Sequence, residues 1–86
     1  MGQRIGQKEL KNLRDKVDRI DLEIVRLLEK RWKTTKEIGK VKRKTGVKYY
    51  DPRRESQVVK SVTKKTKLDK KFVKKIFTAI MTYCRN

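Results

Sequence analysis

Histidine is missing from this sequence, and cysteine and proline each occur only once. The lack of histidine removes the commonest general base and the commonest metal ligand. The single cysteine, Cys84, excludes an intramolecular disulfide, and a lone thiol suits a reducing compartment. We therefore expect a site whose chemistry depends on neither histidine nor a disulfide framework.

Long apolar runs are missing as well. No segment approaches the ~20 apolar residues that span a bilayer, and the first residues lack the apolar core of a secretory signal. We therefore expect a cytoplasmic protein without a membrane partner. The 86 residues suffice for one domain, residues 1–86, of which about residues 1–6 should be loose. A domain this small buries a thin core and often gains stability by association.

Acidic residues are few, since ten stand against 27 lysines and arginines and the formal net charge is +17. Such an imbalance predicts an anionic partner. Residues 60–86 contain nine basic residues and one acidic residue, so the most basic surface should lie there. Its lysines are Lys60, Lys64, Lys65, Lys67, Lys70, Lys71, Lys74 and Lys75.

These lysines leave two interpretations open. They could contact phosphates in a basic helical module that binds nucleic acid, at least nonspecifically. However, no known docking motif accompanies them, and the basic face has few aromatic residues. A solvated surface is the simpler interpretation.

Apolar residues recur every three or four positions in the first half of the chain, which is typical of one helical face. Glycine and proline are absent from Gln7 to Ile38. We predict one helix from about Gln7 to about Lys44, which Gly46 ends. Its apolar face carries Leu10, Leu13, Val17, Ile20, Ile24, Leu27 and Ile38.

Two shorter helices should follow the long one. Asp51 is a good N-cap and Pro52 a good first helical residue, which predicts a helix from about Pro52 to Lys65. Asp69 can cap a third helix, whose apolar residues recur at helical spacing as far as Met81. No strand-like alternation of useful length occurs. The predicted fold class is therefore all-α, with one long and two short helices.

The predicted long helix is longer than a compact domain of 86 residues is wide. It would extend roughly 55 Å, whereas a domain of 86 residues has a radius of gyration of about 12 Å. Two short helices cannot cover its whole apolar face. We therefore expect an intertwined helical homodimer in which a second chain covers the rest, although a plain coiled coil would show the same pattern.

Three charged residues fall on faces that the periodicity assigns to the interior: Arg31 and Lys42 in the long helix, and Glu55 in the next. A buried charge without a partner is very costly, so these groups either pair with one another or bind a ligand. An ion pair of Glu55 with Arg31 or Lys42 is the simpler interpretation. Alternatively, the two cations, about 16 Å apart along the helix axis, can bracket a small anion.

Arg14 lies beside the apolar face, seventeen residues before Arg31 and so roughly 25 Å away along a straight helix. It cannot reach the same pocket within its own chain, but Arg14 of the partner in an antiparallel dimer can. A surface pair with Asp18 is the simpler interpretation. For Asp51 the simpler interpretation is likewise that it only caps the second helix, and for Arg54 it is that the side chain is a solvated surface charge.

Three segments carry motifs in a definite order. Residues 13–31 contain an arginine followed by the pattern IDxxIxxLLxxR, residues 39–42 read GxxK, and residues 51–55 read DxxRE. Each motif alone is weak, because its composition is typical of any helix. Taken together at these separations, over about residues 10–84, they resemble the all-helical chorismate mutases.

The resemblance implies a three-helix protomer in an intertwined dimer with two active sites, without cofactor or metal. The implied catalytic residues are Lys42, Arg31 and Glu55, of which Lys42 would contact the ether oxygen of the breaking bond. Arg31, and Arg14 from the partner, would bind the carboxylates of chorismate. The other implied substrate-binding residues are Asp51, Arg54, Glu55 and Cys84, the last at the position of a family serine.

The function that the resemblance implies is rearrangement of chorismate to prephenate, a step of aromatic amino acid biosynthesis. This reaction is pericyclic and needs no proton transfer, so the lack of histidine is no obstacle. One departure concerns a family glutamine late in the third helix, which would fall two residues beyond Asn86. Three alternatives therefore stay open: a weakly active or noncatalytic dimer of this fold, an isochorismate pyruvate lyase, and the nucleic-acid module.

Overall fold

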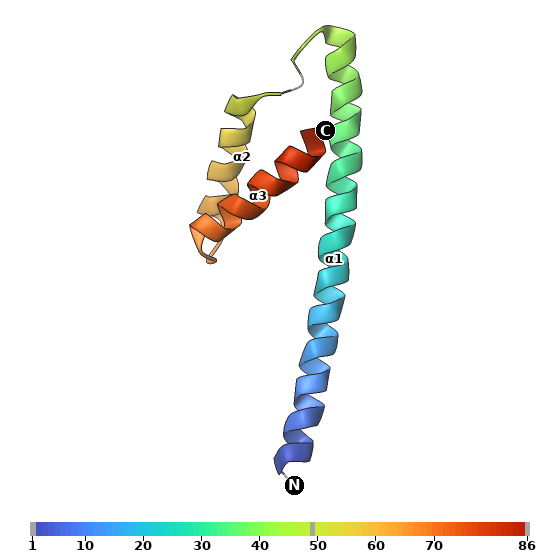
Figure 1. Cartoon of the computed structure of the whole chain (residues 1–86), viewed down its shortest axis with the longest axis vertical. Helices are drawn as coiled ribbons and strands as arrows, with labels where there is room; N and C mark the ends of the chain where they lie inside the picture. The colour runs from blue at the N-terminus through green and yellow to red at the C-terminus, as the bar shows by residue number, and fades with distance from the viewer. Residues whose placement is uncertain (1, 49, 86) are drawn as a thin grey trace. The chain divides into compact units, whose positions relative to one another are not determined.

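The computed structural model describes residues 2–48 and 50–85, and within those ranges it consists of three α-helices without a strand. The helices are α1 (Gly2–Thr45), α2 (Pro52–Lys64) and α3 (Lys70–Arg85) (Figure 1). The predicted all-α class, with one long and two short helices, is confirmed. By contact density the chain divides into two units, one up to Lys30 and one from Arg31 onward.

Helix α1 begins earlier than predicted and ends where predicted. It starts at Gly2 rather than Gln7; Gly2 and Gly6 obscured this start, because glycine costs a helix about 1 kcal/mol relative to alanine. At the other end Gly46 has a φ of 74°, and the Val47 N–H donates to the Lys42 carbonyl at 3.1 Å. This left-handed glycine and its returning hydrogen bond form a Schellman-type end.

The predicted caps of the two short helices are confirmed. The Oδ1 atom of Asp51 accepts the backbone N–H of Arg54 at 3.0 Å, and Pro52 opens α2. The Oδ2 atom of Asp69 accepts the backbone N–H of Phe72 at 3.3 Å, ahead of α3. Each carboxylate satisfies an N–H that the helix itself leaves without a partner.

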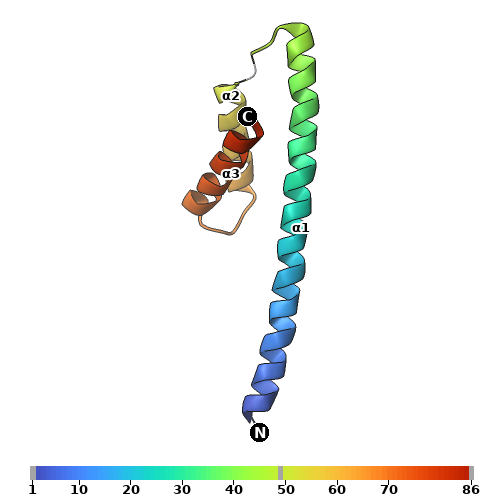
Figure 2. The same cartoon turned by 45° about the vertical axis from the view of Figure 1, so that its right-hand side comes forward.

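The core of the second unit lies between α2 and α3, which run side by side as an antiparallel hairpin (Figures 1 and 2). Only three apolar side chains of the described residues are buried, namely Val73, Met81 and Cys84, all on α3. The three valines of α2, namely Val58, Val59 and Val62, are half-buried. The core is as thin as expected for a chain of this size.

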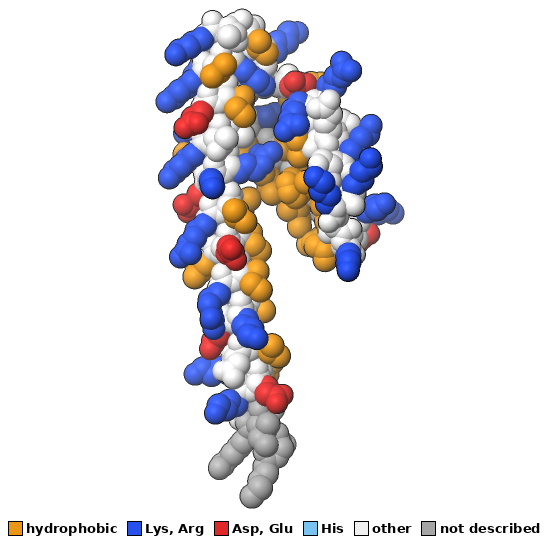
Figure 3. All heavy atoms as spheres, turned by 180° about the vertical axis from the view of Figure 1, so that it is seen from behind, with side chains coloured by type: hydrophobic (Ala, Val, Ile, Leu, Met, Phe, Trp, Pro, Cys, Tyr) orange, Lys and Arg blue, Asp and Glu red, His pale blue; other side chains and the backbone are white. Residues whose placement is uncertain are grey.

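The apolar face of the first unit is uncovered. The side chains from Leu10 to Leu27 on this face are between 45% and 60% exposed, and they form a stripe along the helix (Figure 3). A helix that is apolar along one side normally buries that side. Among residues 2–48 and 50–85, no helix has the length and apolar composition that crossing a bilayer requires.

Candidate active site

One pocket of the second unit is lined by side chains from all three helices. Helix α1 presents one face to it, at spacings of three to four residues, and the N-terminal half of α2 and the last turn of α3 complete it. The lining residues are Arg31, Thr35, Ile38, Lys42, Asp51, Arg54, Glu55, Val58, Met81, Cys84 and Arg85.

Six of the seven predicted site residues line this pocket. They come from three separate stretches of the chain, and the fold brings them together. The seventh, Arg14, belongs to the first unit, is exposed, and is not among the lining residues. Among the described residues, Arg14 and Asp18 form no ion pair, so the surface pair suggested for Arg14 is not observed.

Arg31 is half-buried, and its Nη1 atom is buried with no hydrogen-bond partner among the described residues. An unsatisfied donor of a charged group is costly to bury, so native structures nearly always supply it with an acceptor. A carboxylate is the acceptor that fits a guanidinium best, because two oxygens can meet two N–H groups. The pocket therefore offers an anion-binding donor at Arg31.

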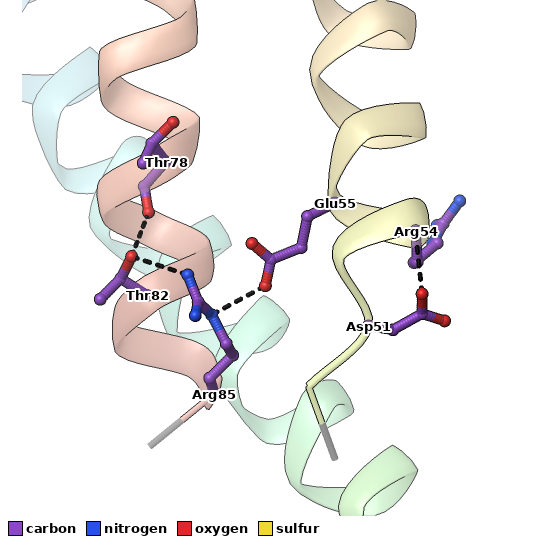
Figure 4. A network of polar contacts seen from close by, with 6 residues as sticks. All are labelled: Asp51, Arg54, Glu55, Thr78, Thr82 and Arg85. Atoms are coloured by element: carbon purple, nitrogen blue, oxygen red, sulfur yellow. Dashed lines mark hydrogen bonds and ion pairs between the residues drawn. The ribbon is translucent and has the colours of Figure 1, made fainter. Parts of the chain in front are cut away.

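Glu55 forms an ion pair across the pocket, with Arg85 and not with Arg31. The distance from Arg85 Nε to Glu55 Oε2 is 2.8 Å, and the two side chains are 31% and 20% exposed (Figure 4). The suggested ion pair of Glu55 with Arg31 is therefore wrong. Arg85 was missed because the apolar residues of α3 predicted an inward face only as far as Met81, whereas the same face continues four residues on to Arg85.

Arg85 has two further contacts that hold its guanidinium in place. Its Nη2 atom donates to Thr82 Oγ1 at 3.2 Å, and its central carbon lies 4.4 Å from the centre of the Tyr50 ring. The Thr82 hydroxyl in turn donates to the Thr78 carbonyl at 2.8 Å (Figure 4). An ion pair, a hydrogen bond and a ring therefore all constrain one side chain.

The remaining predicted residues have simpler surroundings. Lys42 is half-buried and lies on the same face of α1 as Arg31. Asp51 lines the pocket while its side chain caps α2, so its capping role is observed. Arg54 is exposed at the pocket's rim, and the thiol-bearing Cys84 is buried, with 8% exposure.

The charge of the pocket suits a small dianion. Four cations line it against two carboxylates, and one of those carboxylates is engaged by a cation of the pocket itself. An excess of positive charge attracts anions, and the apolar walls beside it strengthen each electrostatic contact relative to the same contact in water. The apolar part of the lining comes from Ile38, Val58 and Met81. The arrangement can hold a compact, partly apolar molecule with two negative groups.

Comparison with known proteins shows that the chain is similar to chorismate mutases. Residues 13–86 match the family model described as chorismate mutase type II. A curated relative, the bifunctional chorismate mutase/prephenate dehydratase of Aquifex aeolicus, is 42% identical over 60 residues. That alignment covers 70% of this chain but only 17% of the relative, so the chain spans a small part of that protein's length.

A solved structure is also similar over almost its full length. Chorismate mutase (form I) from Thermus thermophilus superposes with a TM-score of 0.85 at 31% sequence identity. The match covers 88% of this chain and 98% of that one. With its three helices, its cationic pocket and a family match over nearly all of its length, the chain belongs to the chorismate mutase type II family.

Proposed function

We propose that this protein is an isomerase that rearranges chorismate to prephenate, a step of aromatic amino acid biosynthesis. The observation that carries the proposal is the Nη1 atom of Arg31, which is buried in a cationic pocket and has no hydrogen-bond partner within residues 2–48 and 50–85. A substrate carboxylate would satisfy it. Membership of the chorismate mutase family and the likeness to a chorismate mutase structure support this assignment.

Catalysis of this reaction requires two properties of the pocket. The flexible dianion must be held in the conformation in which its reacting carbons meet, which is an effect of orientation. The negative charge that develops on the ether oxygen must be stabilised by donors already in place. No proton is transferred and no nucleophile is needed, so side chains that position and attract are sufficient.

Each of the six predicted residues that line the pocket then has a task that suits its chemistry. Arg31 would bind one substrate carboxylate through its planar fork, and Lys42 would place a compact charge at the ether oxygen. Glu55 would accept a hydrogen bond from the ring hydroxyl, and the start of α2 near Asp51 would help to hold the same hydroxyl. The rest of the substrate would rest against Arg54 and Cys84, which line the same pocket.

The second substrate carboxylate would be bound by Arg14 of the partner protomer in a homodimer. Two features of the described residues support this. Arg14 is outside the pocket of its own chain, and the apolar stripe beside it is about half exposed. A second copy of α1 would cover that stripe, in the way that paired helices bury their apolar faces. The site would thus be complete only in the dimer.

Chorismate consumption tests the proposed function directly. With purified protein, we expect loss of chorismate absorbance with prephenate as the product, and no added metal or cofactor should be required. Isochorismate should be offered in parallel, with pyruvate release as the readout. Turnover of isochorismate without turnover of chorismate would reassign the protein as a lyase, and turnover of neither would leave a noncatalytic dimer of this fold.

The eight lysines between positions 60 and 75, which lie on α2, on α3 and in the turn that joins them, suggest a second, nonspecific activity. All eight are exposed, and none of them lines the pocket. We expect weak binding of single-stranded or duplex nucleic acid that falls by about a thousandfold or more between roughly 50 and 200 mM salt, as phosphate contacts do. Fluorescence anisotropy with unrelated sequences measures this. Tight, sequence-selective binding at physiological salt would instead favour a nucleic-acid module.

A further inference from the structure

Arg85 links the last turn of α3 to the N-terminal half of α2 inside the pocket. Its guanidinium meets Glu55 at 2.8 Å and Thr82 at 3.2 Å (Figure 4). Its central carbon also lies 4.4 Å from the centre of the Tyr50 ring, so the guanidinium is constrained by three contacts. These contacts come from α2, from α3 and from the segment that precedes α2. A side chain held in this way keeps its partner carboxylate in one position.

The neighbouring cation Arg31 differs from Arg85 in that it forms no ion pair with any described residue. It lines the same pocket as Glu55, yet its buried Nη1 atom has no acceptor among the described residues. Opposite charges in a pocket of low dielectric attract strongly, so a mobile carboxylate there would move toward an unsatisfied guanidinium. In this structure the Oε2 atom of Glu55 instead lies 2.8 Å from the Nε atom of Arg85.

We propose that Arg85 is a positioning residue that holds Glu55 away from Arg31, so that the Arg31 guanidinium stays available for a carboxylate of the substrate. This inference rests on the proposed function, since it assigns Arg31 to a substrate carboxylate. Glu55 and the substrate compete for the same cation. Arg85 favours the substrate in this competition because it binds one oxygen of Glu55. The other oxygen of Glu55 can then accept a hydrogen bond from the substrate hydroxyl.

Loss of Arg85 should therefore weaken substrate binding more than turnover. In Arg85→Ala, Glu55 is released and neutralises Arg31, and we expect KM for chorismate to rise roughly tenfold while kcat changes less, a scale typical of coupled charges in one network. Arg85→Lys keeps the charge next to Glu55 and should recover most of the loss. The matched control is Arg53→Ala, which removes an exposed arginine outside the pocket lining and should leave KM unchanged.

A double substitution separates positioning from direct substrate binding. If Arg85 acts only through Glu55, its removal should have little effect on KM once Glu55→Gln has removed the competing charge. The KM of Arg85→Ala/Glu55→Gln should then equal that of Glu55→Gln. If instead the two effects multiply, Arg85 contacts the substrate itself or acts on the fold, and the proposal is overturned. Melting curves of all the variants identify any that fail to fold.

A second readout does not depend on activity. In nitrogen-15 spectra of arginine side chains, the Nε–H signal of Arg31 can be assigned by its loss in Arg31→Lys. We expect this signal to shift in Arg85→Ala, when Glu55 reaches Arg31, and to return in the double variant. If the protein turns over no chorismate but the signal behaves as expected, the proposed function fails while the control of Glu55 by Arg85 stands. An unchanged Arg31 signal in Arg85→Ala would overturn the inference even in an active enzyme.

Discussion

Replacing Lys42 by alanine is expected to lower kcat by at least roughly a hundredfold, the usual loss when one preorganised donor to a developing oxyanion is removed. Its proposed contact is to the ether oxygen, whose negative charge is larger in the transition state than in chorismate. A residue of this kind affects turnover more than ground-state binding. Steady-state kcat and KM for chorismate, measured for Lys42→Ala, check this expectation.

The fold should survive this substitution for two structural reasons. Lys42 contributes its backbone carbonyl, not its side chain, to the hydrogen bond from Val47 that ends α1, and alanine keeps that carbonyl. Glu55 has an ion-pair partner in Arg85, so removing Lys42 does not leave that carboxylate without a cation. We therefore expect the melting temperature of Lys42→Ala to stay close to that of the parent protein.

Two further variants sharpen the test of Lys42. Lys42→Arg keeps the charge but spreads it over a larger planar group, so it should recover only part of the turnover. Lys44→Ala removes an exposed lysine of the same helix that does not line the pocket, and it should leave kcat unchanged. A Lys42→Ala protein that melts early yet retains near-normal turnover would show that the lysine serves the fold rather than the reaction.

Mixing two inactive variants, Arg14→Ala and Arg31→Ala, is expected to restore activity. In a heterodimer both lesions fall in one site, and the other site combines an intact Arg31 with the partner's intact Arg14. Random exchange of subunits gives about half heterodimers, each with one working site of two, so about a quarter of the parent activity should return. Each variant alone should be nearly inactive, because each loses a carboxylate-binding arginine from both sites.

This experiment also tests the dimer on which it depends. The exposed apolar stripe of α1 predicts a particle of twice the 10.3 kDa chain mass in sedimentation. A brief exposure to mild denaturant, followed by its removal, ensures that subunits exchange, and the parent protein treated in the same way is the control. A compact monomer at micromolar concentration, or a mixture that stays inactive after exchange, would contradict a site shared between protomers.

Local chemistry explains the features of this protein that could be predicted from its sequence. The ends of the helices follow from single residues: Gly46 takes a left-handed conformation, and Asp51 and Asp69 each accept a backbone N–H three positions ahead. These are interactions between near neighbours, so they need no knowledge of the fold. The start of α1 was predicted late because glycines near the N-terminus lower helix propensity without preventing a helix.

Periodicity also predicted which charged residues would face the interior. Arg31, Lys42 and Glu55 fall on inward faces, and all three line the pocket. Their roles toward a substrate stay predictions, as do the dimer and the contribution of Arg14. Periodicity assigns a residue to a face, however, and leaves open which residue of another helix it meets.

The tertiary structure alone decided how the charges of the pocket pair. Arg31, Lys42 and Arg85 are all cations that line the same pocket as Glu55, and the sequence by itself favoured the first two as partners of Glu55. The packing of α3 against α2 brings Arg85 to within 2.8 Å of that carboxylate and, among the described residues, leaves the Nη1 atom of Arg31 unpaired. Helix faces follow from side-chain spacing along one segment, whereas the choice among similar charges depends on distances of a few ångströms between segments, which only the packed helices set.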